Sequence, residues 1–420
     1  MALRRQLSVM AILLGSTAAV LAQPLEPEAV KLDEERLAPG LYPAAPVPEQ
    51  FAIPSPLGQP PLDLDWSVGL RGSFTSATTG ERFVTTLTPQ FTATYDGRRL
   101  DFGIEGSADL TRDGGGDIGL TGLRLGLSGR SPLDSATTAT GSANLVLAQE
   151  PAGSLDLNPL VTVAPQVITG SLGAGIDRQF GKFNLGLRLD GERVINGTST
   201  RLDTGVTDNS DQDYWGGDAS LRLGFQATPV IEVFGQAGIG RDVFDAPPAS
   251  LGVRQDATDR SMRAGIAGKW NSVLSANASV GVGERVFDDP SLDGVTTQLY
   301  DASITYRPDP TLSLTAAVST TITPPGADAA GTARVDRSAT AKIDYTVNSW
   351  LRMRASADWG LAEFAATTET ERRQGLGAGA DYALNAHTAL SADYGYTHRD
   401  NSLTGLSEAH RVTVGITVRR

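Results

Sequence analysis

The feature that most constrains this chain is a repeated pair of alternating apolar and polar stretches, which fills its last two thirds. Clear copies are LRLGFQATPVIEVFGQAGIG, YDASITYRPDPTLSLTAAV and AGADYALNAHTALSADYGY, and their tight turns fall at Pro229, Pro308 and Asn385. Alternation places apolar side chains on one face of a strand and polar ones on the other. The repeat therefore predicts successive β-hairpins in a sheet with one apolar and one polar face.

The length of the stretches indicates which face contacts water. Each stretch has about 11 to 14 residues, more than the roughly five or six of a soluble strand and enough for the 9 to 11 tilted residues that cross a bilayer. The polar face is charged, as where Asn184, Arg188 and Asp190 alternate with leucines. A soluble sandwich would need bulky aromatic side chains in its core, yet aromatic residues make up only 6% of the chain. The pattern favours a transmembrane barrel.

The predicted fold is an all-β, antiparallel, up-and-down transmembrane β-barrel of eighteen strands, with sixteen as the next choice. The connections alternate in length, with long ones at 150–165, 196–212 and 244–256. We expect the short turns to face the periplasm and the long loops to face the exterior. The predicted strands are 66–75, 82–95, 99–111, 118–130, 136–148, 166–179, 182–195, 213–226, 230–243, 257–270, 273–287, 295–307, 311–323, 333–346, 350–364, 374–385, 388–399 and 409–420.

The N-terminal 65 residues lie outside this pattern. Arg4 and Arg5 precede an apolar stretch at 7–20 and a small-residue cleavage site, which predicts a signal peptide at 1–22. Ten prolines crowd residues 23–65, so neither helix nor sheet is favoured there. We interpret 23–65 as a periplasmic tail or linker, with binding of a partner or plugging of the lumen as the alternative. The barrel is expected over 66–420.

Composition narrows the class of protein and its partners. The absence of cysteine excludes disulfides, thiolate metal sites and a lipidated cysteine. A net charge of −13 argues against nucleic-acid binding. The expected partners are outer-membrane lipid, the barrel-assembly machinery during insertion and small hydrophilic solutes. The outward faces look uniformly apolar, so the oligomeric state stays open.

Tryptophans and the last strand agree with a membrane barrel. Three tryptophans (Trp66, Trp270 and Trp350) fall beside short turns, and Trp215 and Trp359 fall toward the loops, as expected for interfacial belts. The last strand puts valines and an isoleucine on one face between 412 and 418. It resembles the terminal strand of outer-membrane barrels, although the chain ends in two arginines instead of an aromatic residue.

Longer segments resemble one known family. The segments NPLVTVAPQVITG, EVFGQAGIGRDVFD and IDYTVNSWLRMRASADW, together with 178–187, 255–283 and 301–316, are similar to the putative beta-barrel porin 2 family of Gram-negative outer membranes. The resemblance spans about 66–420. It implies an outer-membrane barrel and suggests a porin, but it brings no substrate and no functional residues.

Catalytic and metal-binding residues are not expected. His398 and His410 would be neighbours at the outer rim, near Asp393, Asp400 and Glu408, but such side chains are common on solvated loops. The acidic loop at 203–213 lacks the spacing of an EF-hand. We therefore predict no catalytic residue, no metal and no cofactor.

The candidate pore-lining residues are charged side chains on the polar face of the strands. A lipid-facing arginine or lysine at mid-depth would cost about 2 to 4 kcal/mol, so the lumen is the favourable place for them. Rings of opposite charge can constrict a channel, or they can pair and brace a closed wall. The candidates are Asp101, Glu105, Asp109, Arg188, Asp190, Glu192, Arg222, Glu232, Arg263, Lys342, Asp344, Arg352, Arg354 and Asp358.

The function predicted from these features is passive or weakly selective diffusion of small hydrophilic solutes across the outer membrane. The long loops at 150–165 and 196–212 are candidates to fold inward and narrow the pore. Two alternatives stay open. One is a secretion pore for a polymer or polysaccharide, and the other is a structural or adhesive barrel without conductance.

Overall fold

The computed structural model describes residues 62–78, 80–97, 99–114, 116, 118–150, 161–202, 204–248, 251–324 and 331–420. Within them, eighteen long strands form one antiparallel sheet and three short strands form another. The long strands are β1 (Leu62–Ala77), β2 (Gly80–Asp96), β3 (Asp101–Arg112), β4 (Ile118–Pro132), β5 (Thr137–Gln149), β7 (Gln166–Phe180), β8 (Phe183–Asn196), β11 (Tyr214–Thr228), β12 (Ile231–Phe244), β13 (Ala257–Trp270), β14 (Leu274–Phe287), β15 (Val295–Asp309), β16 (Leu312–Thr323), β17 (Arg334–Thr346), β18 (Leu351–Phe364), β19 (Thr370–Ala383), β20 (Thr388–Asn401) and β21 (Gly405–Arg419). The short strands are β6 (Val161–Val163), β9 (Ser199–Arg201) and β10 (Gly205–Thr207).

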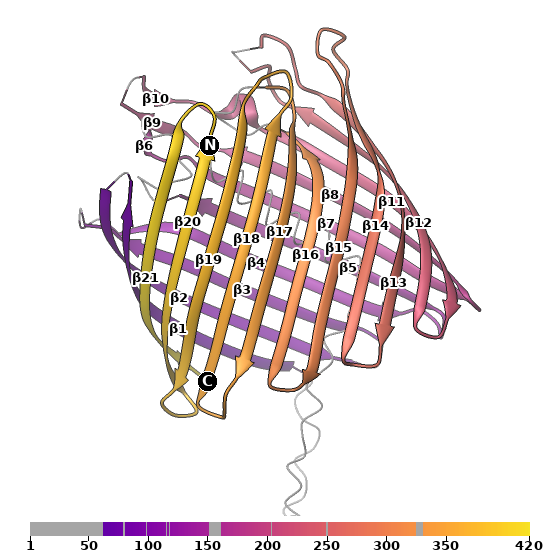
Figure 1. Cartoon of the computed structure of the whole chain (residues 1–420), viewed down its shortest axis with the longest axis horizontal. Helices are drawn as coiled ribbons and strands as arrows, with labels where there is room; N and C mark the ends of the chain where they lie inside the picture. Colours follow the sequence, from indigo (N-terminus) through magenta and orange to yellow (C-terminus); the bar gives the residue numbers. More distant parts are fainter. Residues whose placement is uncertain are drawn as a thin grey trace, which may run out of the picture.

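The long strands close into a barrel. Each pairs with the long strands before and after it in the chain, and β1 also pairs with β21, from Ser67 opposite Arg419 to Ala77 opposite Ala409. Figure 1 shows β12 to β21 in front and β1 to β8 behind them. The predicted eighteen-stranded antiparallel barrel is confirmed.

Three strands begin four residues earlier than the alternation predicts. β1 begins at Leu62, so 62–65 belong to the barrel wall and not to the tail. β19 begins at Thr370 and β21 at Gly405. The start of β19 is the charged sequence Thr-Glu-Arg-Arg, which shows no apolar alternation, and only its pairing with β18 and β20 makes it a strand. The predicted signal peptide and residues 23–61 of the tail lie outside the described residues.

The connections differ between the two ends of the barrel. At one end all are short, as at 181–182, 229–230 and 310–311. Gly181 takes a positive φ of 60°, a conformation that a tight turn requires and that glycine adopts without a steric penalty. At the other end the connections are longer, apart from the hairpins at 78–79 and 402–404. The predicted alternation in length therefore holds for most of the barrel, and we call the two ends the turn end and the loop end.

Strand register assigns every side chain to one face of the wall, because directly paired residues point to the same side. Leu187 pairs with Leu221 and Ile176 on the outward face. Its neighbour Arg188 pairs with Ser220 and Gly175 on the inward face. The wall is thus apolar outside and polar inside.

Outward aromatic side chains mark the two edges of the apolar band. At the turn end they pair across strands, with ring centroids 5.1 Å apart for Tyr95 and Phe102 and 5.1 Å apart for Trp350 and Tyr382. At the loop end, Trp215 and Trp359 are exposed on outward positions. Trp350 therefore lies at the turn end and Trp215 and Trp359 lie toward the loop end, and the placement of the tryptophans at the headgroup levels stays a prediction.

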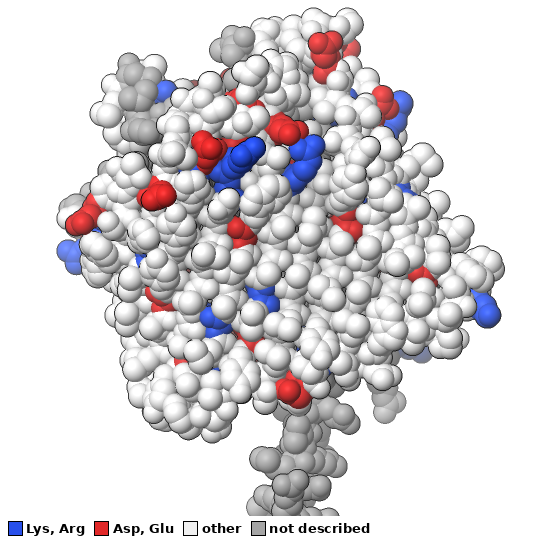
Figure 2. All heavy atoms as spheres, viewed as in Figure 1, with Lys and Arg blue, Asp and Glu red and all other residues white. Residues whose placement is uncertain are grey.

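The outward band is apolar on β8, β11, β17, β18 and β19 alike, but the size of its side chains varies around the barrel. On β17, β18 and β19 its middle carries alanines such as Ala341, Ala355 and Ala378, whereas on β8 and β11 it carries leucines. Figure 2 shows the side of the barrel on which β17, β18 and β19 lie, where residues without charge cover most of the surface, acidic and basic residues gather near the loop end, and further charged residues are scattered below. The barrel thus has a smooth side and a bulky side.

Candidate pore lining

The fourteen charged residues proposed from the sequence all occupy inward-facing register positions. On β3, Asp101 lies opposite Arg130, and Asp109 accepts a hydrogen bond of 2.7 Å from the Thr88 hydroxyl. On β17, Lys342 lies opposite Ser356 and Asp344 opposite Arg354. The register brings some of these residues together and leaves others apart, and their role in permeation stays a prediction.

Arg222 and Glu232 form one of the pairs. Their side chains meet across the turn between β11 and β12 with a distance of 2.8 Å from Nη2 to Oε1. The Arg222 guanidinium also lies 3.6 Å from the centre of the inward-facing Phe234 ring. Arg222 is thus held by a carboxylate and by a cation–π contact.

Arg354 on β18 is the centre of a second cluster. Its Nε donates to Asp393 Oδ1 on β20 over 3.0 Å, and its Nη1 pairs with Asp381 on β19. The sequence prediction included Arg354 but not the two aspartates. The same alternation rule places both on the inward face, but it does not show that they converge on one arginine.

The largest group of inward carboxylates lies on β8, β11, β12 and β13 and was only partly predicted. We call it the acidic tier and define it as Asp190, Glu192, Asp218, Asp242 and Asp259. Directly paired positions run from Asp190 to Asp218, Gly240 and Asp259, and then to Arg285 on β14. The parity of Arg222 and Arg263 could have indicated Asp218 and Asp259 in the sequence.

Arg285 connects two strands of the acidic tier. Its Nη2 lies 2.7 Å from Asp242 on β12, and its Nη1 lies 2.7 Å from Asp259 on β13. The side chain is only 1% exposed. The sequence prediction did not include Arg285, and its two partners lie 26 and 43 residues away in the chain.

An apolar shelf lies beside the acidic tier at the loop end of the inward face. We define it as Val167, Val194, Tyr214 and Phe244, which pack into one buried cluster. The Tyr214 and Phe244 rings are 5.3 Å apart, and the Tyr214 hydroxyl donates to Glu192 Oε1 over 2.7 Å. Bulky apolar groups therefore occupy the lumen where the wall meets the long loops.

The two long loops proposed to narrow the pore are joined to each other. β6 lies in the first loop and pairs with β9 in the second, and β9 pairs with β10. The second loop ends at Asp213, whose Oδ1 accepts from the Asn196 backbone N–H over 2.7 Å and so closes it at its base. Figure 1 shows this small sheet at the loop end. Residues 151–160 lie outside the described part of the chain, and insertion of either loop into the lumen stays a prediction.

The side of the barrel opposite the acidic tier carries inward arginines. In the strand order β20, β21 and β1 lie halfway round from β11 and β12. Arg71 lies opposite Gly415, and Arg411 Nε donates to Thr75 Oγ1 over 3.3 Å. The wall opposite the acidic tier thus carries inward arginines, together with Asp393 on β20.

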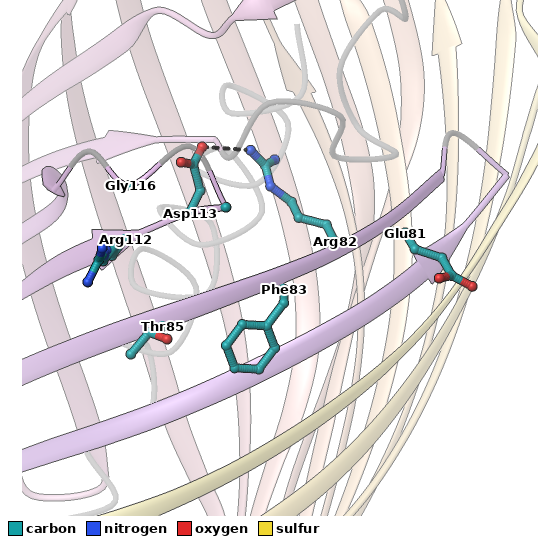
Figure 3. Close-up of a pocket in the computed structure, with 8 residues that line it drawn as sticks. Glu81, Arg82, Phe83, Thr85, Arg112, Asp113 and Gly116 are labelled. Atoms are coloured by element: carbon teal, nitrogen blue, oxygen red, sulfur yellow. Dashed lines mark hydrogen bonds and ion pairs between the residues drawn. The ribbon is translucent and has the colours of Figure 1, made fainter.

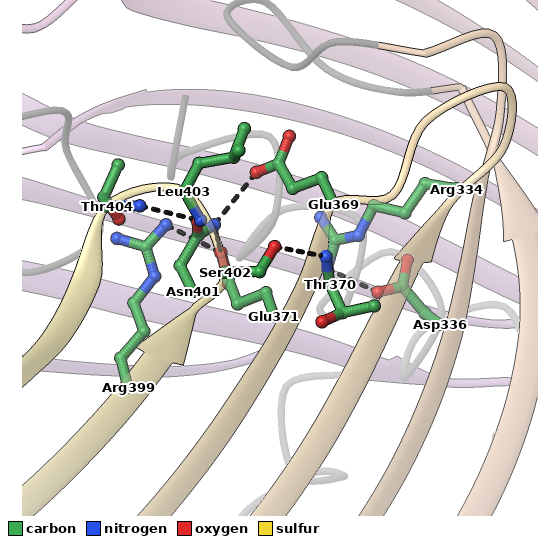
Figure 4. A network of polar contacts seen from close by, with 10 residues as sticks. All are labelled: Arg334, Asp336, Glu369, Thr370, Glu371, Arg399, Asn401, Ser402, Leu403 and Thr404. Atoms are coloured by element: carbon green, nitrogen blue, oxygen red, sulfur yellow. Dashed lines mark hydrogen bonds and ion pairs between the residues drawn. The ribbon is translucent and has the colours of Figure 1, made fainter.

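A buried polar network braces the loop end of β19 and β20. The Asn401 amide donates to Glu369 over 2.9 Å and to Glu371 over 3.2 Å, and Arg399 donates to Glu371 over 2.7 Å. Asn401 Oδ1 also accepts the backbone N–H of Leu403 over 2.8 Å. Figure 4 shows these side chains converging below the turn of the last hairpin, beside the Arg334–Asp336 pair.

We expect Asn401→Ala to lower the free energy of unfolding by about 1 to 3 kcal/mol. The change removes the amide that donates to Glu369 and Glu371 and the oxygen that accepts the Leu403 N–H, and it leaves buried carboxylate oxygens without these hydrogen bonds. Urea titration in vesicles would measure the change. Ser402→Ala is the matched control, because it removes only the hydroxyl that Thr370 N–H donates to at the exposed rim. Equal losses for the two variants would contradict the bracing role.

A depression at the rim lies between the first hairpin and β3. Its lining includes Arg82, Phe83 and Asp113. Figure 3 shows Arg82 and Asp113 pointing toward each other, with a distance of 3.1 Å from Nη2 to Oδ2, while Arg112 points away. The ion pair joins β2 to the β3–β4 connection and so stabilises the edge of the barrel beside the depression.

Outside the strands, two aspartates at the loop end form ion pairs with outward arginines. The hydrogen bond from Arg193 holds the pKa of Asp245 below its usual value, and the bond from Arg241 does the same for Asp288. Arg241 Nη1 lies 2.7 Å from Asp288 Oδ1. Because these charges lie beyond the apolar band, they do not face hydrocarbon.

The histidine cluster of the last hairpin lies on the outward face. His398 Nδ1 is 3.1 Å from Glu408 Oε1, and the Tyr394 hydroxyl is 2.9 Å from His410 Nδ1. Asp393 points to the lumen instead, so the wall separates it from the histidines. Among the described residues, no group of three or more His, Asp or Glu side chains is arranged to hold a metal ion. In that same part of the chain, no helix is long and apolar enough to cross a membrane.

A closed antiparallel barrel with an apolar outward band and a charged interior is an outer-membrane barrel of the porin class. The chain matches the family described as Putative beta-barrel porin 2 over residues 71–420, and it belongs to that family. The resemblance drawn from the sequence is thereby confirmed, as is the outer-membrane location. Family and fold together point to a channel and away from an enzyme.

Several solved structures are similar to the chain at low identity. OpdK of Pseudomonas aeruginosa with vanillate has 10% identity and a TM-score of 0.44, over 85% of this chain and 99% of that one. OccK5 (OpdH) of the same organism has 11% identity and a TM-score of 0.44, over 85% and 98%. A loop-deletion mutant of OmpT, an outer membrane protein of Vibrio cholerae, has 12% identity and a TM-score of 0.33, over 86% and 100%. None of the curated proteins compared matches the chain.

Proposed function

We propose that this barrel is a diffusion channel for small hydrophilic solutes with weak charge selectivity. The observation that carries the proposal is the inward face of a closed eighteen-stranded wall, lined by charges of both signs. A barrel of this size is wide enough for an aqueous path. Mixed lumen charge fits small solutes better than a long polymer, for which a lining of one sign would be expected.

The membrane orientation and the N-terminal segments belong to the same proposal. The turn end faces the periplasm and the loop end faces the exterior, as in other single-chain barrels. Residues 1–22 are a cleaved signal peptide, and 23–61 form a periplasmic tail before β1. The barrel contacts outer-membrane lipid and is inserted by the barrel-assembly machinery.

Single-channel recording of the refolded mature protein in a planar bilayer tests the channel. We expect discrete conductance steps, and a salt gradient will give a reversal potential of modest size because lumen charges of both signs are present. Folding is checked separately by the mobility shift on heating that membrane barrels show in detergent gels. Folded, inserted protein that produces no steps would overturn the channel proposal.

A second candidate is a barrel without conductance, and the apolar shelf favours it. Val167 and Phe244 on the inward face are 2% and 1% exposed, so packed side chains fill part of the lumen at the loop end. Such packing also fits a constricted channel. The bilayer recording distinguishes the two, because only the constricted channel gives steps.

A further inference from the structure

The acidic tier has an uneven charge balance. Its five carboxylates come from four adjacent strands, and Arg285 forms ion pairs with two of them, Asp242 and Asp259. Two glycines let the carboxylates approach one another. A Cβ at Gly240 would collide with Asp218, and a Cβ at Gly216 would lie 2.9 Å from Glu192 Cγ and 3.2 Å from Asp242 Oδ1. The strands therefore provide space for converging acids.

Arg285 reaches into this group from its β14 edge. Its side chain is 1% exposed, and it reaches β12 and β13 from β14. Within the described residues, Arg285 Nε and Asp259 Oδ1 are both buried and make no hydrogen bond. The Arg285 guanidinium thus keeps one donor, and the Asp259 carboxylate keeps one acceptor, that no described protein group meets.

Other basic groups on this wall lie closer to the turn end. Arg222 is paired with Glu232, and Arg188 is two residues along β8 from Asp190. Arg263 lies four residues along β13 from Asp259. Arg71 and Arg411 lie on the far wall. The negative charge near the loop end is thus offset by Arg285, which forms two ion pairs, and by Arg188, which attracts Asp190.

We propose that the acidic tier makes the channel prefer cations, and that Arg285 is the specificity-determining residue that limits this preference. The inference rests on the proposed channel function and names its solute class, small inorganic and organic cations. A cation that passes the tier is attracted by carboxylates that Arg285 does not bind. An anion meets the same tier as a barrier.

The experiment measures the potassium-to-chloride permeability ratio from reversal potentials in a KCl gradient, with the full-length mature protein. We expect a ratio above one for the native protein. Arg285→Met should raise the ratio roughly two- to fivefold, because it removes one positive charge and so leaves more of the negative charge of the acidic tier to act on passing ions. Asp218→Asn should lower the ratio. Arg285→Lys, which keeps the charge, should leave it nearly unchanged.

The outcomes test the channel proposal and the role of the acidic tier separately. Conductance steps with the same ratio in the native protein, Arg285→Met and Asp218→Asn would overturn the role of the tier and leave the channel intact. An absence of steps in the folded native protein would overturn the channel itself. If Arg285→Met does not fold, Asp218→Asn and Asp190→Asn carry the test, and a ratio that does not fall in either overturns the inference.

Discussion

Replacing Ala302 with arginine is expected to lower the free energy of unfolding by about 2 to 4 kcal/mol, whereas the same change at its neighbour Ser303 is expected to cost far less. Both residues lie near the middle of β15. Ala302 pairs with Ala278 and Val318 on the outward face, and Ser303 pairs with Asn277 and Ala317 on the inward face. The outward arginine must enter hydrocarbon, while the inward one meets the polar lumen.

The measurement is urea unfolding in lipid vesicles, followed by tryptophan fluorescence. Ala302→Leu is the control for added volume, because it enlarges the outward side chain without a charge. Ser303→Ala separates the loss of the hydrogen bond from Asn277, which is 3.0 Å long, from the effect of the added charge. A larger loss for Ser303→Arg than for Ala302→Arg would mean that the assignment of the two faces is wrong.

Excising residues 198–208 and joining Gly197 to Asn209 through two glycines is expected to raise the single-channel conductance roughly twofold, if this loop narrows the pore as we propose. The cut is feasible because Asn209 Nδ2 donates to Gly197 O over 2.8 Å, so the two ends are already adjacent. The excision removes β9 and β10, and with them the partner strand of β6. The closing bond from Asn196 N–H to Asp213 is kept.

A matched variant keeps the length of the loop. Leu202→Ser with Val206→Ser alters two exposed apolar side chains and leaves the backbone in place. We expect its conductance to equal that of the native protein. Unchanged conductance after the excision would sink the idea that this loop narrows the pore, and the apolar shelf would then be the remaining candidate for the constriction.

The sequence predicted which charged residues face the lumen, but not which of them contact one another. Alternation placed all fourteen proposed residues on the inward face, because the direction of a side chain in a strand follows from its position alone. It could not show that Arg354 binds Asp381 and Asp393, since these partners lie 27 and 39 residues away. Such contacts depend on register and on side-chain packing, and neither is a local property.

The ends of the strands were likewise predictable only where the local alternation is clear. Within β19 the alternation from Gln374 onward is readable, but Thr370 to Arg373 join the strand only because β18 and β20 extend beside them. Likewise, Leu62 to Asp65 continue the pattern of β1 directly after a proline-rich segment whose composition suggested a linker. Pairing with a neighbouring strand decided these boundaries where composition and pattern gave weak signals.

The sequence by itself determined the class of fold, the number of strands, the turns and the two faces, because each follows from a period of two residues and from short segments rich in Gly, Pro, Asn and Asp. Only the tertiary structure decided that β1 and β21 close the wall, that β6 and β9 join the two long loops, and that Arg285 lies buried between Asp242 and Asp259. Closure and burial bring together residues that are distant in the chain. Their free energy depends on geometry that exists only once the barrel has formed.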